Sequence, residues 1–185
     1  MEEFSKMVDK AVEFATKAHE GQYRKGTKRP FIVHPLEVGD IVATMTSDPE
    51  VISAAILHDT IEDCKGVTEE VIATEFTERI AHIVAQESED KSKSWMERKG
   101  TTISHIKKAP KEVQMIGLAD KLSNMRDIDR DYQTVKDELW NRFRMKDKNT
   151  IGWYYKGIRD ALRTAFSETE AFKEYSMLIE KNFPE

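Results

Sequence analysis

A histidine and three carboxylates lie within six residues at the end of an apolar run. The stretch is AAILHDTIED, residues 54–63, and its polar members are His58, Asp59, Glu62 and Asp63. His58 and Glu62 are four positions apart, and so are Asp59 and Asp63. On a helix, these two pairs would cover two adjoining stripes of one surface. Three acids beside an apolar run repel one another and are poorly solvated. The cluster therefore indicates a bound cation, and the alternative is the solvated polar face of an amphipathic helix.

A second histidine, His34, stands directly before a proline in PFIVHPLEVGDIVATM. Pro35 suits the first turn of a helix that is predicted to run to about Met45. Because the residue before a proline is pushed towards extended geometry, the imidazole of His34 is expected to point out from the helix end towards a neighbouring element. The alternative is a structural histidine whose hydrogen bonds are satisfied.

A further carboxylate, Asp120, closes the apolar run in KEVQMIGLADKLSNMRDI, residues 111–128. Asn124 follows one helical turn later and is expected on the same face. A carboxylate after an apolar run is poorly solvated if its helix is central, so it needs a partner. The alternative is an exposed acid near a helix end.

Two imidazoles and two carboxylates suit a borderline divalent ion such as Mn²⁺, Fe²⁺, Zn²⁺ or Co²⁺, and fit neither an all-oxygen calcium site nor a thiolate site. The candidate ligands are His34, His58, Asp59 and Asp120. Four protein ligands leave positions open for water and a substrate oxygen, which is typical of a catalytic metal.

The composition predicts one domain, or one domain with a short helical appendage, in a chain of 185 residues that is 39% hydrophobic and 34% charged. No window approaches 18 uninterrupted apolar residues, and the N-terminal stretch is acidic and amphipathic. We therefore expect neither a membrane span nor a signal peptide, and a cytoplasmic location. The single cysteine, Cys64, excludes an internal disulfide and a cysteine-rich zinc site.

The net charge of −5 predicts that the protein repels nucleic acid, so an anionic ligand must be held locally. The densest basic cluster is the glycine-containing segment YRKGTKR, residues 23–29, for which an ordinary solvated loop is the alternative. Its cations are Arg24, Lys25, Lys28 and Arg29.

Helical periodicity runs through the chain, and no pair of strands with a turn signal is present, so the predicted fold is all-α. Helices are expected at 2–19, 35–45, from Pro49 through 54–63, from Thr68 to 76, 78–88, 95–108, 111 to about 130, and in three aromatic-rich segments at 132–149, 151–166 and 168–183. His19 is expected to interact with the dipole at the end of the first helix. The aromatic side chains expected to pack the C-terminal helices are Trp140, Phe143, Trp153, Tyr154, Tyr155, Phe166, Phe172 and Tyr175.

The order H…HD…D resembles the HD superfamily of metal-dependent phosphohydrolases. The phrases GQYRKGTKRPFIVHPLEV, AAILHDTIED, SEDKS followed by ERK, and LADKLSNMRDI resemble the hydrolase domain of RelA/SpoT-type proteins over about residues 5–130. Because synthetase and regulatory domains do not fit in this length, the chain is more similar to the stand-alone small alarmone hydrolases, the Mesh1-like group. The resemblance implies a single-domain HD-type bundle of about eight to ten helices, with a hydrolase core at 1–130 and C-terminal helices at 131–185 packed on the same domain.

The resemblance also implies roles for individual residues. It makes the four candidate ligands hold manganese, and it matches Glu62 and Asp63 to the acidic pair that handles the attacking water. Arg24 matches a basic residue beside the metal site, and Lys25 matches one that lies against the guanine ring. The other residues implied to contact substrate are Lys91, Lys99, Asn124 and Tyr154.

The implied reaction is Mn²⁺-dependent hydrolysis of the 3′-pyrophosphate of the alarmone (p)ppGpp, a nucleotide of the stringent response, giving GDP or GTP and pyrophosphate. One alternative is another HD-type nucleotide phosphohydrolase, either a nucleotidase or phosphodiesterase or an NADPH 2′-phosphatase. The other is a non-catalytic metal- and nucleotide-binding sensor. Glu62 and Asp63 argue against the sensor, because a sensor has no need of a water-activating pair. The sequence leaves the oligomeric state open.

Overall fold

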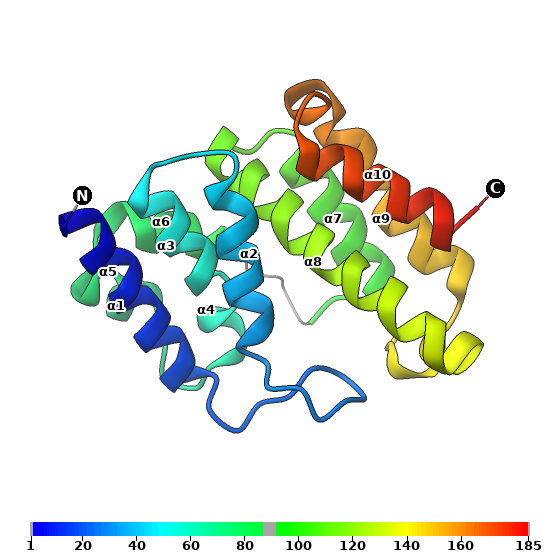
Figure 1. The fold of residues 1–185 in the computed structure, drawn as a ribbon, viewed down its shortest axis with the longest axis horizontal. Coiled ribbons are helices and arrows are strands. Elements are labelled where there is room, and N and C mark those ends of the chain that lie inside the picture. Colours follow the sequence, from blue (N-terminus) through cyan, green and yellow to red (C-terminus); the bar gives the residue numbers. More distant parts are fainter. Residues whose placement is uncertain (1, 87–91, 185) are drawn as a thin grey trace. The chain divides into compact units, whose positions relative to one another are not determined.

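The computed structural model describes residues 2–86 and 92–184, with side chains from residue 6 onwards. Within that part of the chain there are ten α-helices and one 3-10 helix (Figure 1), and its only β pairing is an isolated bridge between Tyr23 and Pro30. The all-α prediction is confirmed. None of the described helices is long and apolar enough to cross a membrane.

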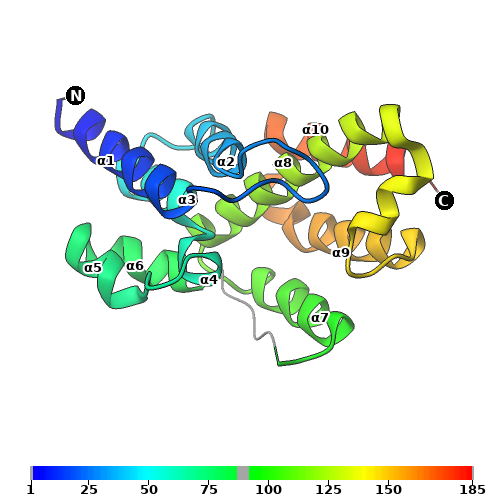
Figure 2. The same cartoon turned by 90° about the horizontal axis from the view of Figure 1, so that it is seen from below.

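The chain divides into two compact units, residues 1–89 and 90–185. The first contains α1 (Glu2–Ala18), α2 (Val33–Ala43), α3 (Pro49–Leu57), α4 (Thr60–Asp63), α5 (Glu69–Glu75) and α6 (Glu78–Ala85). Helix α3 is its centre and packs against α1, α2 and α6 (Figure 2). All residues from 51 to 57 are buried, as expected for a helix with apolar side chains on every face.

Local signals define the start of α3 and its contact with α2. Asp48 caps the helix by accepting a hydrogen bond from the N–H of Glu50, and Pro49 is the first helical residue, as predicted. Gly39 of α2 faces Ile56 so closely that a Cβ atom there would lie 2.6 Å from Cγ1 of Ile56. The absence of a side chain at Gly39 therefore sets the α2–α3 distance.

The second unit contains α7 (Trp95–Ile106), α8 (Lys111–Val135), the 3-10 helix η1 (Lys136–Arg142), α9 (Lys148–Phe166) and α10 (Glu170–Asn182). Helix α8 contacts each of the other four elements. Arg126 of α8 donates two hydrogen bonds of 2.6 Å to Glu174 of α10, and Asp129 accepts from Lys181 and Asn182. These polar contacts fix α10 along α8. Whether residues 1–130 and 131–185 form one domain with a core and appended helices stays a prediction.

The predicted continuous helix through residues 54–63 is wrong. Helix α3 ends at Leu57, two residues form a turn, and α4 starts at Thr60. The hydroxyl of Thr60 donates to the carbonyl of Leu57 at 2.7 Å, and the N–H of His58 reaches back only three residues, to Ala55. The threonine side chain thus satisfies a helix-end carbonyl and interrupts the ladder.

The separate helix expected at 132–149 is also wrong. Helix α8 extends to Val135, and η1 follows because Lys136 takes a positive φ of 50°, which ends an α-helix. Six of the eight expected aromatic side chains are buried, and Phe143 is half-buried against Trp140. Trp153 is 42% exposed, whereas Tyr154 and Ile158 of the same helix are buried.

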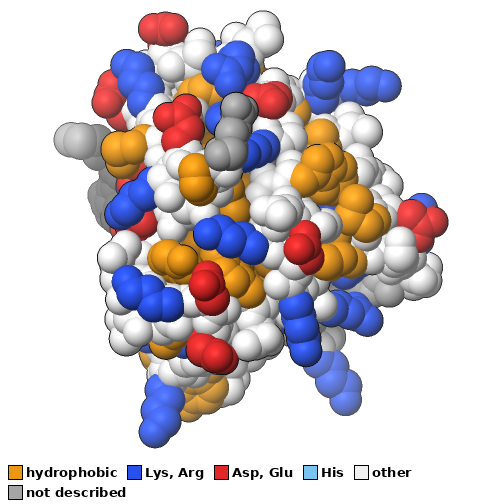
Figure 3. Space-filling model, turned by 90° about the vertical axis from the view of Figure 1, so that its right-hand side faces the viewer, with side chains coloured by type: hydrophobic (Ala, Val, Ile, Leu, Met, Phe, Trp, Pro, Cys, Tyr) orange, Lys and Arg blue, Asp and Glu red, His pale blue; other side chains and the backbone are white. Residues whose placement is uncertain are grey.

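On the face shown in Figure 3, basic and acidic side chains are interspersed and apolar side chains form separate patches.

Candidate metal centre

Two imidazole nitrogens and one carboxylate oxygen of the first unit point to a common location. Oδ2 of Asp59 lies 3.6 Å from Nε2 of His34 and 3.1 Å from Nε2 of His58. The two imidazole centroids are 5.2 Å apart, and each histidine is only 3% exposed. Three donors of the types that transition metals prefer therefore converge in a largely buried position.

His34 lies inside the first turn of α2 and not before it. The helix begins at Val33, and the N–H of His34 donates to the carbonyl of Phe31 at 3.0 Å. The predicted extended backbone before Pro35 is therefore wrong. The first turn of a helix tolerates proline because its N–H groups have no intrahelical acceptor, and here that tolerance outweighs the steric preference of the preceding residue.

His58 and Asp59 form the turn between α3 and α4. Nδ1 of His58 lies 2.8 Å from the carbonyl oxygen of Ala55. Because a carbonyl only accepts, Nδ1 carries the proton, and Nε2 keeps a lone pair for a metal. Metal-binding histidines typically have such a second hydrogen bond, which fixes the ring and its tautomer.

The acidic pair Glu62 and Asp63 lies on α4, immediately after this turn. Glu62 is half-buried and Asp63 is exposed. The two-stripe arrangement expected from one helix does not hold, because the helix is interrupted at His58 and Asp59. Helix α4 nevertheless keeps the pair within one turn of Asp59, whose carbonyl accepts from the N–H of Asp63 at 2.9 Å.

The basic segment 23–29 is a loop whose ends are joined by backbone hydrogen bonds. The N–H of Arg24 donates to the carbonyl of Arg29 at 2.8 Å. The guanidinium of Arg24 lies 5.5 Å from the ring centroid of Phe31, and the same ring contacts His34 at 5.9 Å. Phe31 therefore holds Arg24 on the His34 side of the loop, whereas Lys25 is exposed.

Asp120 of α8 is the carboxylate of the second unit that the sequence predicted, and it is 7% exposed. Its Oδ1 accepts from Nδ2 of Asn124 at 2.8 Å, so the two share a helix face as expected. Its Oδ2 is paired with the ammonium of Lys121. Burial alone would lower the pKa of Lys121, but the charge of Asp120 raises that pKa well above its usual value.

Two lysines of the second unit lie over one tyrosine ring. Nζ of Lys99 is 4.9 Å, and Nζ of Lys121 is 5.8 Å, from the ring centroid of Tyr154. Tyr154 is buried, with Trp95 at its edge. Lys99 and Tyr154 are thus brought together, whereas Lys91 lies outside the described residues.

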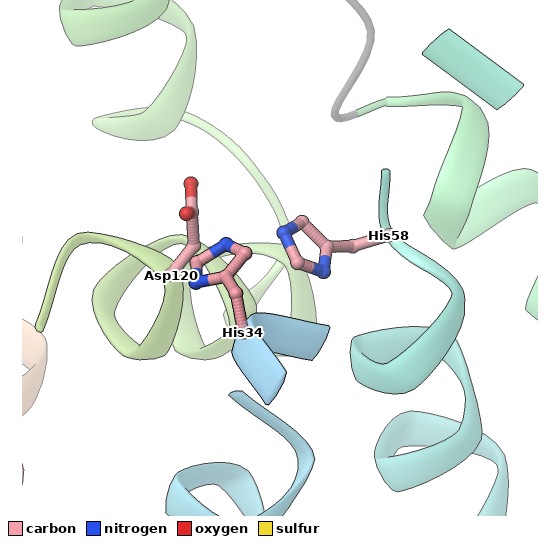
Figure 4. Close-up of side chains that lie close together, drawn as sticks. All are labelled: His34, His58 and Asp120. Atoms are coloured by element: carbon pink, nitrogen blue, oxygen red, sulfur yellow. The ribbon is translucent and has the colours of Figure 1, made fainter. Parts of the chain in front are cut away.

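Figure 4 draws the three buried candidate donors, which are His34 of α2, His58 of the α3–α4 turn and Asp120 of α8. Their imidazole nitrogens and carboxylate oxygens suit a borderline divalent ion.

Residues 11–146 match the HD domain family. This chain belongs to the HD domain family. The chain is 35% identical over 144 residues to the guanosine-3′,5′-bis(diphosphate) 3′-pyrophosphohydrolase MESH1 of Xenopus tropicalis. The matched region covers 76% of this chain and 78% of that protein. It is 31% identical over 140 residues to human MESH1, covering 74% of this chain and 75% of that protein.

A solved structure described as a metazoan ortholog of SpoT that hydrolyzes ppGpp superposes on this chain with a TM-score of 0.78. It is 23% identical and covers 95% of this chain and 94% of that chain, so it shows a common fold. The family match and the MESH1 relatives confirm the predicted homology to MESH1 and to RelA/SpoT hydrolase domains.

Sequence reasoning missed two polar residues of this HD domain. No role was predicted for Lys121, although it directly follows Asp120 on a helix with many apolar residues. His19 was expected to act only on a helix dipole, but it is 2% exposed, and its Nδ1 lies 2.8 Å from Oε1 of Gln22. No local pattern indicated that burial, because it depends on Phe31, whose ring is 4.7 Å away.

Proposed function

We propose that this HD domain is a Mn²⁺-dependent guanosine-3′,5′-bis(diphosphate) 3′-pyrophosphohydrolase that converts (p)ppGpp to GDP or GTP and pyrophosphate. The observation that carries the proposal is the convergence of the His34 and His58 Nε2 atoms on Asp59 Oδ2. It occurs in a chain that is similar, over about three quarters of its length, to MESH1 proteins named for this activity.

The proposed metal ligands are His34, His58, Asp59 and Asp120. Their donor types fit manganese and neighbouring divalent ions, and the Ala55 carbonyl supports His58 in the tautomer that a metal requires. When bound, such an ion lowers the pKa of a coordinated water and neutralises charge on a phosphate.

The remaining polar residues have separate proposed tasks. Glu62 and Asp63 accept or position the proton of the attacking water. Arg24, held against Phe31, and Lys99, held against Tyr154, place positive charge where phosphate oxygens gain charge during the reaction. The other proposed contacts are Lys25 with the guanine ring, and Asn124, Tyr154 and Lys91 with the nucleotide.

The test is a turnover assay of the purified protein with Mn²⁺ against ppGpp, NADPH and deoxynucleotide monophosphates side by side, with products separated by ion-exchange chromatography. We expect GDP and pyrophosphate from ppGpp, with the highest kcat/KM of the set. A higher kcat/KM for NADPH or a monophosphate would replace the proposed substrate. Tight ppGpp binding without product would identify a sensor.

A further inference from the structure

Gln22 joins the base of the basic loop to the helix that carries the acidic pair. Its Nε2 donates to the carbonyl of Asp63, the last residue of α4, at 2.9 Å. Its own N–H donates to the carbonyl of His19, and its carbonyl accepts from the N–H of Phe31 at 2.9 Å. The backbone of Gln22 is therefore fixed in the loop, while its side chain reaches 41 residues along the sequence.

The hydrogen bond to Asp63 satisfies a group that the short helix cannot satisfy itself. After Asp63 the chain leaves α4, because Cys64 has extended backbone angles, φ −115° and ψ 120°. The last carbonyls of a helix lack intrahelical donors. Helix α4 spans only four residues, so this external donor lies within one turn of every side chain on it.

The carbonyl of Asp63 fixes the orientation of the Gln22 amide, and His19 holds the other end of that amide. A carbonyl only accepts, so the group of Gln22 that faces Asp63 must be the NH₂. The amide oxygen then faces Nδ1 of His19 at 2.8 Å, and Nδ1 must carry the proton. The imidazole of His19 also contacts the ring of Phe31, with the two ring planes tilted by 36°.

The thiol of Cys64 lies beside this chain of hydrogen bonds. Sγ of Cys64 lies 3.4 Å from Nδ1 of His19, and the thiol is 7% exposed. Burial, together with the charge of Asp63, raises the pKa of Cys64 to about 11, so the thiol is neutral at pH 7. Gln22 itself is half-buried and Asp63 is exposed, so the test of this bond is the position of α4 and not the cost of a buried, unsatisfied amide.

We propose that Gln22, held by His19, is a positioning residue that ties helix α4, with Glu62 and Asp63, to the base of the loop that carries Arg24. The inference rests on the proposed function for its catalytic consequence, but the clamp itself rests on the hydrogen bonds alone. It gives a role to the H-x-G-Q stretch, residues 19–22, which the metal and substrate roles leave unused.

The first experiment compares Gln22→Met with Gln114→Met. Gln114 is a matched control because it is also half-buried and donates from Nε2 to the carbonyl of Ile106, the last residue of α7, at 2.9 Å. Gln22→Met should lower kcat for ppGpp by about 10–100-fold, the effect of misplacing a reacting group by about 1 Å. KM and manganese content should change less, since the backbone hydrogen bonds of the loop remain. Gln114→Met should leave kcat unchanged.

A double variant distinguishes positioning from general destabilisation. In an Asp63→Asn background, Gln22→Met should lower kcat by a smaller factor than in the wild type, because part of its effect acts through the carboxylate that Asp63→Asn has already removed. Multiplication of the two separate factors would overturn the inference. If Gln22→Met fails to fold, Gln22→Glu replaces it, since an ionised carboxylate of the same shape cannot donate to the carbonyl.

Amide hydrogen exchange tests the clamp without using turnover. With manganese added, the amides of Asp63 and Cys64, which donate to Asp59 and Thr60, should exchange faster in Gln22→Met and at the wild-type rate in Gln114→Met. Unchanged exchange in Gln22→Met would overturn the clamp. If the wild type does not hydrolyse ppGpp, the proposed function fails, and the exchange rates still decide whether Gln22 holds α4.

Discussion

At the scale of single residues, the side chains around the α3–α4 turn differ in their hydrogen bonds and in their exposure. His58 has one nitrogen committed to the carbonyl of Ala55 and the other near Asp59, so its geometry is that of a ligand. Glu62 and Asp63 follow on α4 and are more exposed than the histidines. This access suits the proposed task of the pair, which is to exchange protons with the attacking water.

The acidic pair should therefore be separable from metal binding. Glu62→Gln and Asp63→Asn should retain manganese, as measured by elemental analysis, while turnover of ppGpp falls on the order of 10²–10⁴-fold, the usual share of general acid–base catalysis. His105→Ala, at an exposed position of α7, is the control for an unrelated polar change. Loss of metal in both acidic variants would reassign these residues as ligands.

Arg24 and Lys25 are adjacent but should act differently. Lys25→Ala should raise KM for ppGpp, because contact with the purine ring exists in the ground state and the transition state alike. Arg24→Ala should lower kcat, because its charge is aimed at oxygens that gain charge during the reaction. Steady-state kinetics with ppGpp and p-nitrophenyl phosphate provides the measurement.

p-Nitrophenyl phosphate, which lacks a nucleotide base, is the control substrate for Lys25→Ala and Arg24→Ala. Lys25→Ala should impair hydrolysis of ppGpp and spare p-nitrophenyl phosphate, which has no ring for the lysine to contact. Equal impairment of both substrates would show that Lys25 acts on phosphate or on folding.

At the scale of elements, the start of α3 is held by a charged cluster. Arg79 of α6 is 2.8 Å from Oδ2 of Asp48 and from Oε2 of Glu50. Burial opposes ionisation of Asp48, but its hydrogen bonds to Arg79 and to the N–H of Glu50 lower its pKa. Hydrogen bonds from Arg79 and Thr77 lower the pKa of Glu50.

Both carboxyl pKa values are depressed in the folded state, so the stabilisation is present above the unfolded values of about 4 and is lost as the pH falls through the folded values. Arg79→Gln should flatten the fall in unfolding free energy between about pH 5 and pH 2. The loss at pH 7 should be only about 0.2–1 kcal/mol, because the side chains are 25–44% exposed and solvent screens them. Urea titrations at several pH values measure it, and an unchanged slope would contradict the assignment.

The space around two helical glycines predicts opposite effects for their substitution. Gly39→Ala should destabilise by about 1–3 kcal/mol, because its Cβ would overlap the side chain of Ile56. Gly100→Ala in α7 meets no atom within 4 Å and should stabilise by about 0.5–1 kcal/mol. Both are measured by urea denaturation, and a neutral Gly39→Ala would show that α2 can move away from α3.

At the scale of the whole molecule, the proposed metal couples the site to folding. An ion that binds only the folded chain adds about 2.7 kcal/mol at a free concentration 100 times its Kd. Mn²⁺ should therefore raise the melting temperature of the wild type and have little effect on His58→Ala. Chelation should abolish turnover, and added Mn²⁺ should restore it. Full activity in protein shown by elemental analysis to be metal-free would contradict the proposed metal dependence.

The sequence alone determined the features that depend on residue type and short spacing. The donor types at His34, His58 and Asp59, the cap at Asp48 and the helical periods are all local properties, and the structure has most of the predicted helices, apart from the break after Leu57 and the region after Val135. Asn124 was expected on the face of Asp120 for the same reason, because a spacing of four fixes a shared face on any helix.

Only the tertiary structure decided how distant groups meet. The approach of His34 to Asp59 and the bond from Gln22 to Asp63 join residues that lie 25 and 41 positions apart, so no periodic pattern encodes them. The break at His58 depends on a hydroxyl competing with the backbone for the carbonyl of Leu57, a balance between two hydrogen bonds of similar strength. Sequence spacing supplies the donors, whereas packing and hydrogen bonding between distant segments give them a common direction.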